Sequence, residues 1–223
     1  MKFIYLPYQL EIDIWEQQIT VLTIENSKAY SEILSDLWNQ IEGIEGELIL
    51  AENEKVKKIS KDVDLVFNPF SLNCNNKKVL TKLYQELKGT TSEILLSESV
   101  EINKQILEYL EKVTNQVPYS LDYEVDFDVT NLLKIYDVRM NSLAENLLEK
   151  IVEYIKAVNR ICNIRIFIFV GLKQYLTENE LEQLYEFIFY EHVYLIILEP
   201  MFTQILKGEK CCILDSDLCI IEP

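Results

Sequence analysis

The densest chemical feature of this 223-residue sequence is a row of acidic side chains. Asp122, Glu124, Asp126 and Asp128 occupy every second position, and apolar residues alternate with them. In an extended chain alternate side chains point the same way, so the four carboxylates share one side. Carboxylates this close repel one another, and Ca²⁺, which takes six to eight oxygen ligands, would relieve that repulsion. The row therefore predicts a calcium site.

Other interpretations of the acidic row stay open. Its spacing resembles the first half of an EF-hand loop, but Phe127 stands where that loop needs glycine and Leu133 where it needs a bidentate glutamate. The row also suits the solvated edge of an amphipathic segment. A third possibility is Mg²⁺ for a metal-dependent phosphohydrolase or nuclease, although the lysine, histidine or glycine loop that usually accompanies such a site is missing here.

Basic residues gather at two places in a chain that is acidic overall. Lysines and arginines number 21 against 37 acids, which gives a net charge of −16. The first group is Lys55, Lys57, Lys58 and Lys61, and the second, on and after a long predicted helix, is Lys156, Arg160 and Arg165. Such side chains contact nucleic-acid phosphates. The alternative is that the lysines protect a sheet edge from aggregation, which favours a protein-binding scaffold with no DNA role.

Several common catalytic arrangements are missing from the sequence. The one histidine, His192, has no nucleophile motif to accompany it. The five glycines form neither GxGxxG nor GxxxxGK[ST], so a phosphate-binding loop is excluded. The five cysteines lack a CxxC pair and a zinc spacing, and Cys211 and Cys212 are expected as small buried side chains.

Composition and the N-terminal residues predict a cytoplasmic protein. The first fifteen residues carry acids among apolar residues, which is unlike a signal peptide. No apolar run approaches the ~20 residues that cross a bilayer, so no membrane contact is expected. The number of cysteines is odd, so at least one has no disulfide partner within the chain, which is typical of a reducing compartment.

Hydrophobic periodicity predicts an α/β protein. Alternating or β-branched runs predict strands at 2–6, 10–15, 19–24, 47–52, 63–67, 164–170 and 193–198, and a terminal hairpin over 211–221. Apolar spacing of i, i+3, i+4 predicts helices at 28–42 and 141–162, and a capping box at Thr177 and Glu180 starts another.

The middle of the chain is predicted to contain helices and no strand. Patterns at 76–88 and 98–113 are separated by Gly89, and a further helix is expected at 129–139. The organisation is therefore a discontinuous α/β head, 1–67 and 141–223, with an α-helical leg subdomain inserted at 68–140.

The order and spacing of these segments resemble the CRISPR-associated Csn-two family, which acts in type II-A spacer acquisition. The resemblance rests on ITVLTIEN (19–26), LDYEVDFD (121–128), IFIFVGLKQYLTENELEQLYEFI (166–188), LIILEP (195–200) and CILDSDLCII (212–221).

The resemblance implies a homotetrameric ring without enzymatic activity. It implies a head of P-loop-ATPase-like shape without a nucleotide site, and an extended helical leg. It also implies that the ring binds double-stranded DNA, prefers linear ends, and threads the DNA through a basic central hole. Bound Ca²⁺ would stabilise the ring, with Asp122, Glu124, Asp126 and Asp128 as ligands. The implied partners are the CRISPR integrase complex and the effector nuclease.

Overall fold

The structure, a computed structural model, describes residues 1–52 and 55–223 and divides into two compact units. The first unit is Met1–Cys74 with Ser142–Pro223, and the second is Asn75–Asn141. Residues 68–74, expected in the leg, thus belong to the first unit. There the short 3₁₀ helix η2 (Pro69–Ser71) contacts α6 (Leu147–Cys162), and Leu72 and Cys74 are buried.

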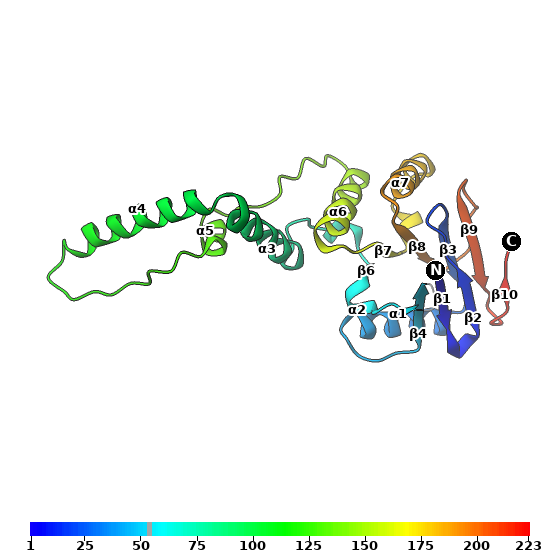
Figure 1. The fold of residues 1–223 in the computed structure, drawn as a ribbon. Helices are drawn as coiled ribbons and strands as arrows, with labels where there is room; N and C mark the ends of the chain where they lie inside the picture. The colour runs from blue at the N-terminus through cyan, green and yellow to red at the C-terminus, as the bar shows by residue number, and fades with distance from the viewer. Residues whose placement is uncertain (53–54) are drawn as a thin grey trace. The chain divides into compact units, whose positions relative to one another are not determined.

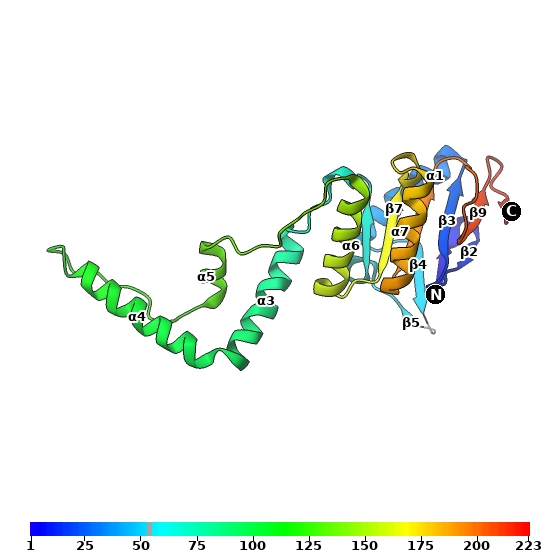
Figure 2. The same ribbon diagram turned by 90° about the horizontal axis from the view of Figure 1, so that it is seen from above.

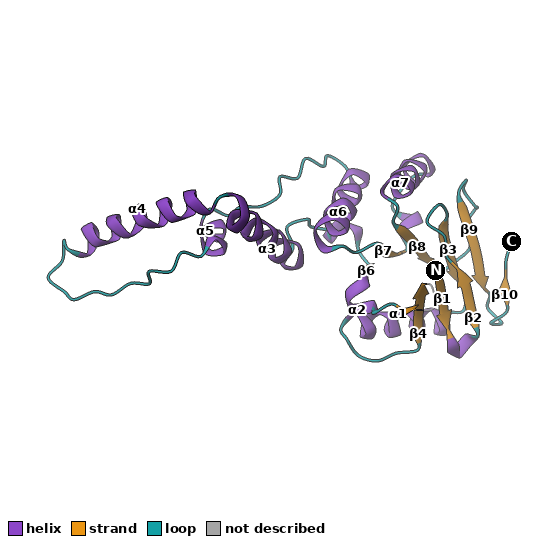
Figure 3. Ribbon diagram, in the orientation of Figure 1, coloured by secondary structure: helices purple, strands orange, loops and turns teal. Residues whose placement is uncertain are grey.

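A six-stranded sheet forms the centre of the first unit, with the order β10-β9-β3-β8-β7-β6 (Figures 1 and 3). The parallel strands are β3 (Ile19–Ile24), β6 (Val63–Val66), β7 (Ile166–Val170), β8 (Tyr194–Glu199) and β9 (Glu209–Leu214), and β10 (Ile220–Ile221) joins β9 antiparallel. All six residues of β3 are buried, as expected for a central strand. The predicted α/β class is confirmed.

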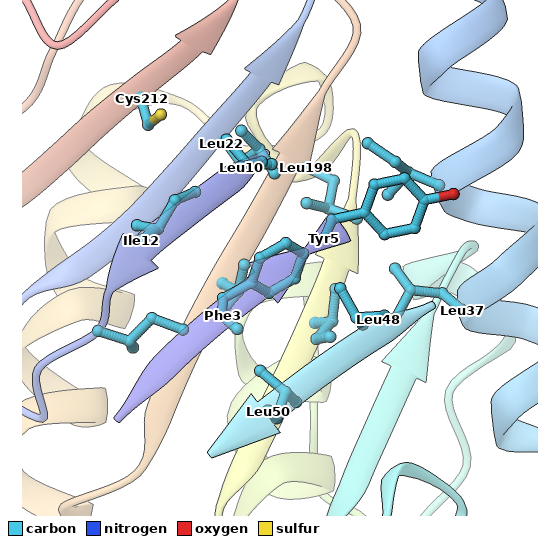
Figure 4. Close-up of a cluster of buried hydrophobic side chains, with 14 of the residues drawn as sticks. Phe3, Tyr5, Leu10, Ile12, Leu22, Leu37, Leu48, Leu50, Leu198 and Cys212 are labelled. Carbon is cyan, nitrogen blue, oxygen red and sulfur yellow. The ribbon is translucent and has the colours of Figure 1, made fainter. Parts of the chain in front are cut away.

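A smaller antiparallel sheet packs against one face of the large sheet. Its strands are β1 (Lys2–Tyr5), β2 (Leu10–Asp13), β4 (Leu48–Glu52) and β5 (Lys55–Val56), in the order β2-β1-β4-β5. The 3₁₀ helix η1 (Leu6–Tyr8) joins β1 to β2. Figure 4 shows Phe3, Leu10 and Leu50 from the small sheet meeting Leu22 and Leu198 from the large one. This cluster is the core that holds the two sheets together.

Helices cover both faces of the large sheet. Helix α1 (Ser27–Ile41) and the short α2 (Ile59–Asp62) lie on the side of the small sheet, and α6 with α7 (Glu178–Glu191) on the other (Figure 1). The predicted capping box at Thr177 and Glu180 is present. The 3₁₀ helix η3 (Leu172–Gln174) follows β7. With helices on both faces, the inner strands are covered, whereas the edge strand β10 is exposed.

The helix predicted at 141–162 begins later than expected. Residues 141–146 are irregular, and α6 starts after Asn146, whose side chain accepts a hydrogen bond from Glu149 N. Two glutamates explain the irregular segment, because Glu153 accepts from Leu143 N at 2.9 Å and Glu149 from Glu145 N at 2.8 Å. These bonds satisfy backbone amides outside the helix.

The second unit contains α3 (Lys77–Ile94), α4 (Leu96–Thr114) and α5 (Val129–Ile135) (Figure 2). The predicted break at Gly89 is wrong, since α3 continues to Ile94. The hydroxyls of Thr90, Thr91 and Ser92 donate to carbonyls one turn earlier, so these residues are satisfied inside the helix. The helix predicted at 129–139 ends at Ile135.

Two predictions, one about Cys211 and Cys212 and one about membrane-spanning helices, can be compared with the structure. Cys211 and Cys212 are buried on β9 as expected, and burial raises the pKa of Cys212 to about 11. Among the described residues, no helix is both long and apolar enough to cross a bilayer.

Replacing Gly89 with alanine is expected to stabilise the helical unit by about 1 kcal/mol. Gly89 lies inside α3, and a Cβ at this position meets nothing within 4 Å. Gly43→Ala is the matched control: its Cβ is equally unobstructed, but its φ of +88° is strained for alanine. Thermal unfolding followed by circular dichroism should show the G89A midpoint rising and the G43A midpoint falling. A lower midpoint for G89A would contradict a continuous α3.

Candidate nucleic-acid interface

The first predicted basic group lies between β4 and β6. Lys55 belongs to the edge strand β5, Lys58 precedes α2 as its N-cap residue, and Lys61 lies in the last turn of α2. All three side chains are exposed, and none forms an ion pair with a residue that the structure describes. They are therefore available to an external anion.

Lys57 differs from its neighbours because it is already paired. Its ammonium lies 2.6 Å from Glu52 Oε2, and Tyr194 OH donates to the other Glu52 oxygen at 2.9 Å. These two donors lower the pKa of Glu52, the lysine contributing most. Lys57 therefore already has a counter-charge within the fold, and its assignment as a DNA contact stays a prediction.

Arg165 extends the same network at the amino ends of the parallel strands. Its Nη2 lies 2.6 Å from Glu16 Oε1 and donates to His192 O at 2.7 Å, and its guanidinium sits 5.7 Å from the Tyr194 ring centroid. Tyr194 OH also lies 3.2 Å from Glu16 Oε1, so the two carboxylates compete for its single proton and Glu52 is the nearer. Burial and the hydrogen bond to Glu52 raise the pKa of Tyr194, which stays protonated.

The second predicted basic group divides in the same way. Lys156 and Arg160 lie four residues apart on α6 and so share a face. Arg160 Nη2 pairs with Glu191 Oε1 at 2.7 Å, whereas Lys156 is exposed and has no ion pair within the described ranges. Of the seven predicted DNA contacts, the ones facing solvent without such a pair are therefore Lys55, Lys58, Lys61 and Lys156.

The acidic segment has no regular secondary structure; Asp122, Glu124 and Asp126 are exposed and Asp128 is half-buried. Asp128 caps α5 by accepting from Thr130 N at 3.1 Å, and Lys88 Nζ lies 3.2 Å from its Oδ1. These contacts, the lysine first, lower the pKa of Asp128. Asp122 accepts from the neighbouring Tyr123 N at 2.9 Å. Each outer carboxylate thus already has a partner.

A calcium ion does not fit this segment as the single chain arranges it. Among residues 1–52 and 55–223, no three His, Cys, Asp or Glu side chains come together to hold a metal ion. A six- to eight-oxygen shell would need several of the four carboxylates to turn toward one point, and Asp128 is instead held by Lys88 and by α5.

A phosphate-binding loop would lie between β3 and α1, at the carboxyl ends of the strands. In this chain only two residues occupy that position. Glu25 and Asn26 alone join β3 to α1, and Asn26 Oδ1 accepts from Lys28 N and Ala29 N, both at 3.1 Å. Asn26 Nδ2 donates to Ser216 O at 2.9 Å. The first amides of α1 are thus occupied by the protein itself, which agrees with the sequence exclusion of a nucleotide loop.

A buried polar cluster elsewhere in this unit is structural. Lys173 Nζ lies 3.0 Å from Glu209 Oε2, and Tyr185 OH donates to the other oxygen of Glu209 at 2.6 Å. Glu199, whose pKa is raised by burial, accepts from Lys173 N at 2.9 Å. No buried side-chain nitrogen or oxygen in the described part of the chain lacks a hydrogen-bond partner. The cluster therefore has no unsatisfied buried polar atom to offer a ligand.

Sequence reasoning missed the carboxylates and the tyrosine that hold Lys57 and Arg165. Tyr194 reads as one apolar member of a buried strand, and its partners Glu52 and Glu16 are 142 and 178 residues away. No local spacing links such residues, and only the fold brings them together.

Comparison with known proteins gives a consistent result. The family model described as CRISPR-associated protein (Cas_Csn2) matches residues 40–218. A CRISPR-associated protein Csn2 from Enterococcus faecalis is 23% identical over 87% of this chain and 89% of its own length. Another, from Streptococcus agalactiae, is 21% identical over 81% of each chain.

A solved structure supports the fold. The crystal structure of Stu0660 of Streptococcus thermophilus matches with a TM-score of 0.64 at 15% identity, and the match covers 100% of this chain and 76% of that one.

Glu52→Gln is expected to cost about 1 kcal/mol at neutral pH, because Lys57 loses its counter-charge while the shape is kept. The folded pKa of Glu52 is lowered, so its contribution is present above the ordinary glutamate pKa and is lost as the pH falls through the lowered value. The difference from wild type should therefore shrink below about pH 4.

Urea unfolding from pH 7 to pH 3 measures this difference. Glu45→Gln, an exposed glutamate on the same unit, is the control and should match wild type throughout. An E52Q deficit that persists unchanged into acid would contradict the network.

Proposed function

The chain belongs to the CRISPR-associated Csn2 family, and we propose that it is a ring-forming protein that binds double-stranded DNA during spacer acquisition. Its role therefore lies in CRISPR-based defence. In this proposal it acts without catalysing a reaction, as a homotetramer that takes linear DNA ends into a basic central hole. The integrase complex and the effector nuclease are its proposed partners.

The observation that carries the DNA-binding proposal is the solvent-facing lysine set Lys55, Lys58, Lys61 and Lys156. In a chain of net charge −16, Lys55, Lys58 and Lys61 lie within seven residues and have no ion pair in the described structure, so they make a local positive surface, and Lys156 is a separate exposed charge on α6. Salt screens electrostatic interactions beyond about 10 Å. A bound phosphate is therefore affected more by the positive charge of the nearby lysines than by the negative net charge of the whole chain. Binding of this kind should be independent of sequence and sensitive to salt.

The exposure of α4 supports assembly of several copies. None of its residues is buried, and Val100, Ile102 and Val113 are exposed large apolar side chains. Packing of an apolar face supplies most of the stability of a helix in a protein. A second copy of the chain would cover this face.

Reversing the charge of Lys55, Lys58 and Lys61 together is expected to lower affinity for duplex DNA by at least 100-fold, with the oligomer intact. Three lost phosphate contacts should also reduce the slope of log affinity against log salt by about 2.7, at 0.9 per contact. Fluorescence anisotropy with a labelled duplex measures both, and light scattering measures the mass.

The control reverses three exposed lysines elsewhere, Lys104, Lys112 and Lys207. It changes the net charge by the same amount, so it separates local contact from total charge. Equal losses in the two triple variants would remove Lys55, Lys58 and Lys61 from the interface. Cleavage of the duplex in the presence of Mg²⁺ would instead favour the phosphohydrolase alternative.

Calcium binding by Asp122, Glu124, Asp126 and Asp128 stays a prediction. Calorimetric titration of the assembled protein is expected to show calcium uptake that Asp122→Asn with Asp126→Asn abolishes. These two positions are chosen because neither caps a helix, whereas Asp128 does. Identical titrations for wild type and variant would return the segment to a solvated edge.

A further inference from the structure

A basic groove lies within the helical unit, between α3 and α5. It encloses about 690 Å³ and is lined by Lys77, Leu80, Tyr84 and Lys88 from α3 and by Thr130 and Lys134 from α5. All of these residues lie inside Asn75–Asn141, so the groove belongs to one compact unit. None of them is among the predicted DNA contacts.

The groove is fixed by packing and hydrogen bonds. Leu80, Tyr84 and Lys88 follow Lys77 at three, seven and eleven residues, which puts them on one face of the helix. Tyr84 OH donates to Val138 O at 2.9 Å. Asn75 exchanges two hydrogen bonds with Met140, at 2.8 and 2.9 Å, so the two ends of the unit are held together.

The charge of the groove is not explained by the stability of the fold. Residues 77–88 contain four lysines and one glutamate. Lys77 is the first residue of α3, and a cation there opposes the positive end of the helix dipole. Neither Lys77 nor Lys134 forms an ion pair with the described residues. Both ammonium groups are exposed and so accessible to an anion from outside the chain.

The spacing of the lysines suits a ligand with repeated negative charges. Lys77 and Lys88 are separated by eleven residues, roughly 16 Å along the helix axis at 1.5 Å per residue. Lys134 faces them from α5. One small anion cannot span this distance, whereas a polyanion can meet all three ammonium groups.

We propose that this groove binds the phosphodiester backbone of double-stranded DNA, as a contact surface separate from the β5–α2 lysines. The inference rests on the proposed function and adds a site on the helical unit. The groove offers no stacking platform for bases, because the Tyr84 ring is buried and its hydroxyl is already donated. Recognition here is therefore of charge and not of sequence.

An acidic peptide is a poorer occupant of the groove. Both walls are helices, whose backbone groups are already bonded, so an extended peptide finds no edge to pair with.

Asp128 restrains the groove by pairing with Lys88 at 3.2 Å. Asp128→Asn should release Lys88 and remove a negative charge from the rim. Asparagine is also a good N-cap, so α5 should keep its start. This variant is expected to bind duplex DNA several-fold more tightly than wild type, a gain that misfolding cannot produce.

The test measures binding of a labelled 30-base-pair duplex by anisotropy across a salt series without calcium. Lys77→Gln with Lys134→Gln is expected to weaken binding about 10-fold or more and to reduce the salt slope by about 1.8, at 0.9 per contact. The matched control is Lys104→Gln with Lys112→Gln, which removes two lysines from α4. Lys112 and Lys134 both lie in the last turn of their helices. Circular dichroism checks that each variant is folded.

The outcomes separate this inference from the proposed function. If wild type binds DNA and K77Q/K134Q matches its control, the inference is overturned while the proposed function stands. If wild type does not bind DNA, both fail. Displacement of the duplex by poly-glutamate of equal charge as readily as by unlabelled DNA would overturn the assignment in favour of an acidic protein segment.

Discussion

Burial of the parallel sheet is the constraint on which the rest of the first unit depends. Strands β3 and β8 are buried at every residue, so they need cover on both faces. Helices α6 and α7 supply one cover, and α1 with the small sheet supplies the other (Figure 1). Covered faces leave strand ends as the places where charged side chains can reach water. Charged side chains of the unit therefore lie at those ends or on the helices, as Lys156, Arg160 and Glu191 do.

Two kinds of basic residue result from this arrangement. Lys57, Arg160 and Arg165 form ion pairs with Glu52, Glu191 and Glu16, respectively. These pairs join separate elements of the fold. Lys55, Lys58 and Lys61, and Lys77 and Lys134 of the α3–α5 groove, have no ion pair with a residue that the structure describes, whereas Lys88 pairs with Asp128. A net acidic protein can bind a polyanion through the second kind, because salt screens the more distant acids.

Sequence periodicity was sufficient for elements whose pattern is local. The alternating and β-branched runs predicted β2, β3, β7 and β8, and the capping box predicted the start of α7. It failed at two local features: Gly89, which lies inside a continuous helix whose next hydroxyls donate one turn back, and the loop 142–146, whose amides are satisfied by glutamates four and ten residues further on. It also could not find sites assembled from distant residues: Tyr194 with Glu52 and Glu16, or Lys134 with Lys77 and Lys88. In these cases tertiary contacts decide the structure.

The most direct test of the account compares linear with covalently closed circular duplex DNA of equal length, on protein whose mass is measured by light scattering. A ring that takes DNA through its hole is expected to be a tetramer, to bind the linear duplex in a mobility shift, and to leave the closed circle unbound. Addition of Ca²⁺ is expected to strengthen both the tetramer and the linear complex. Equal binding of the two topologies, or a monomer that binds neither, would contradict the account.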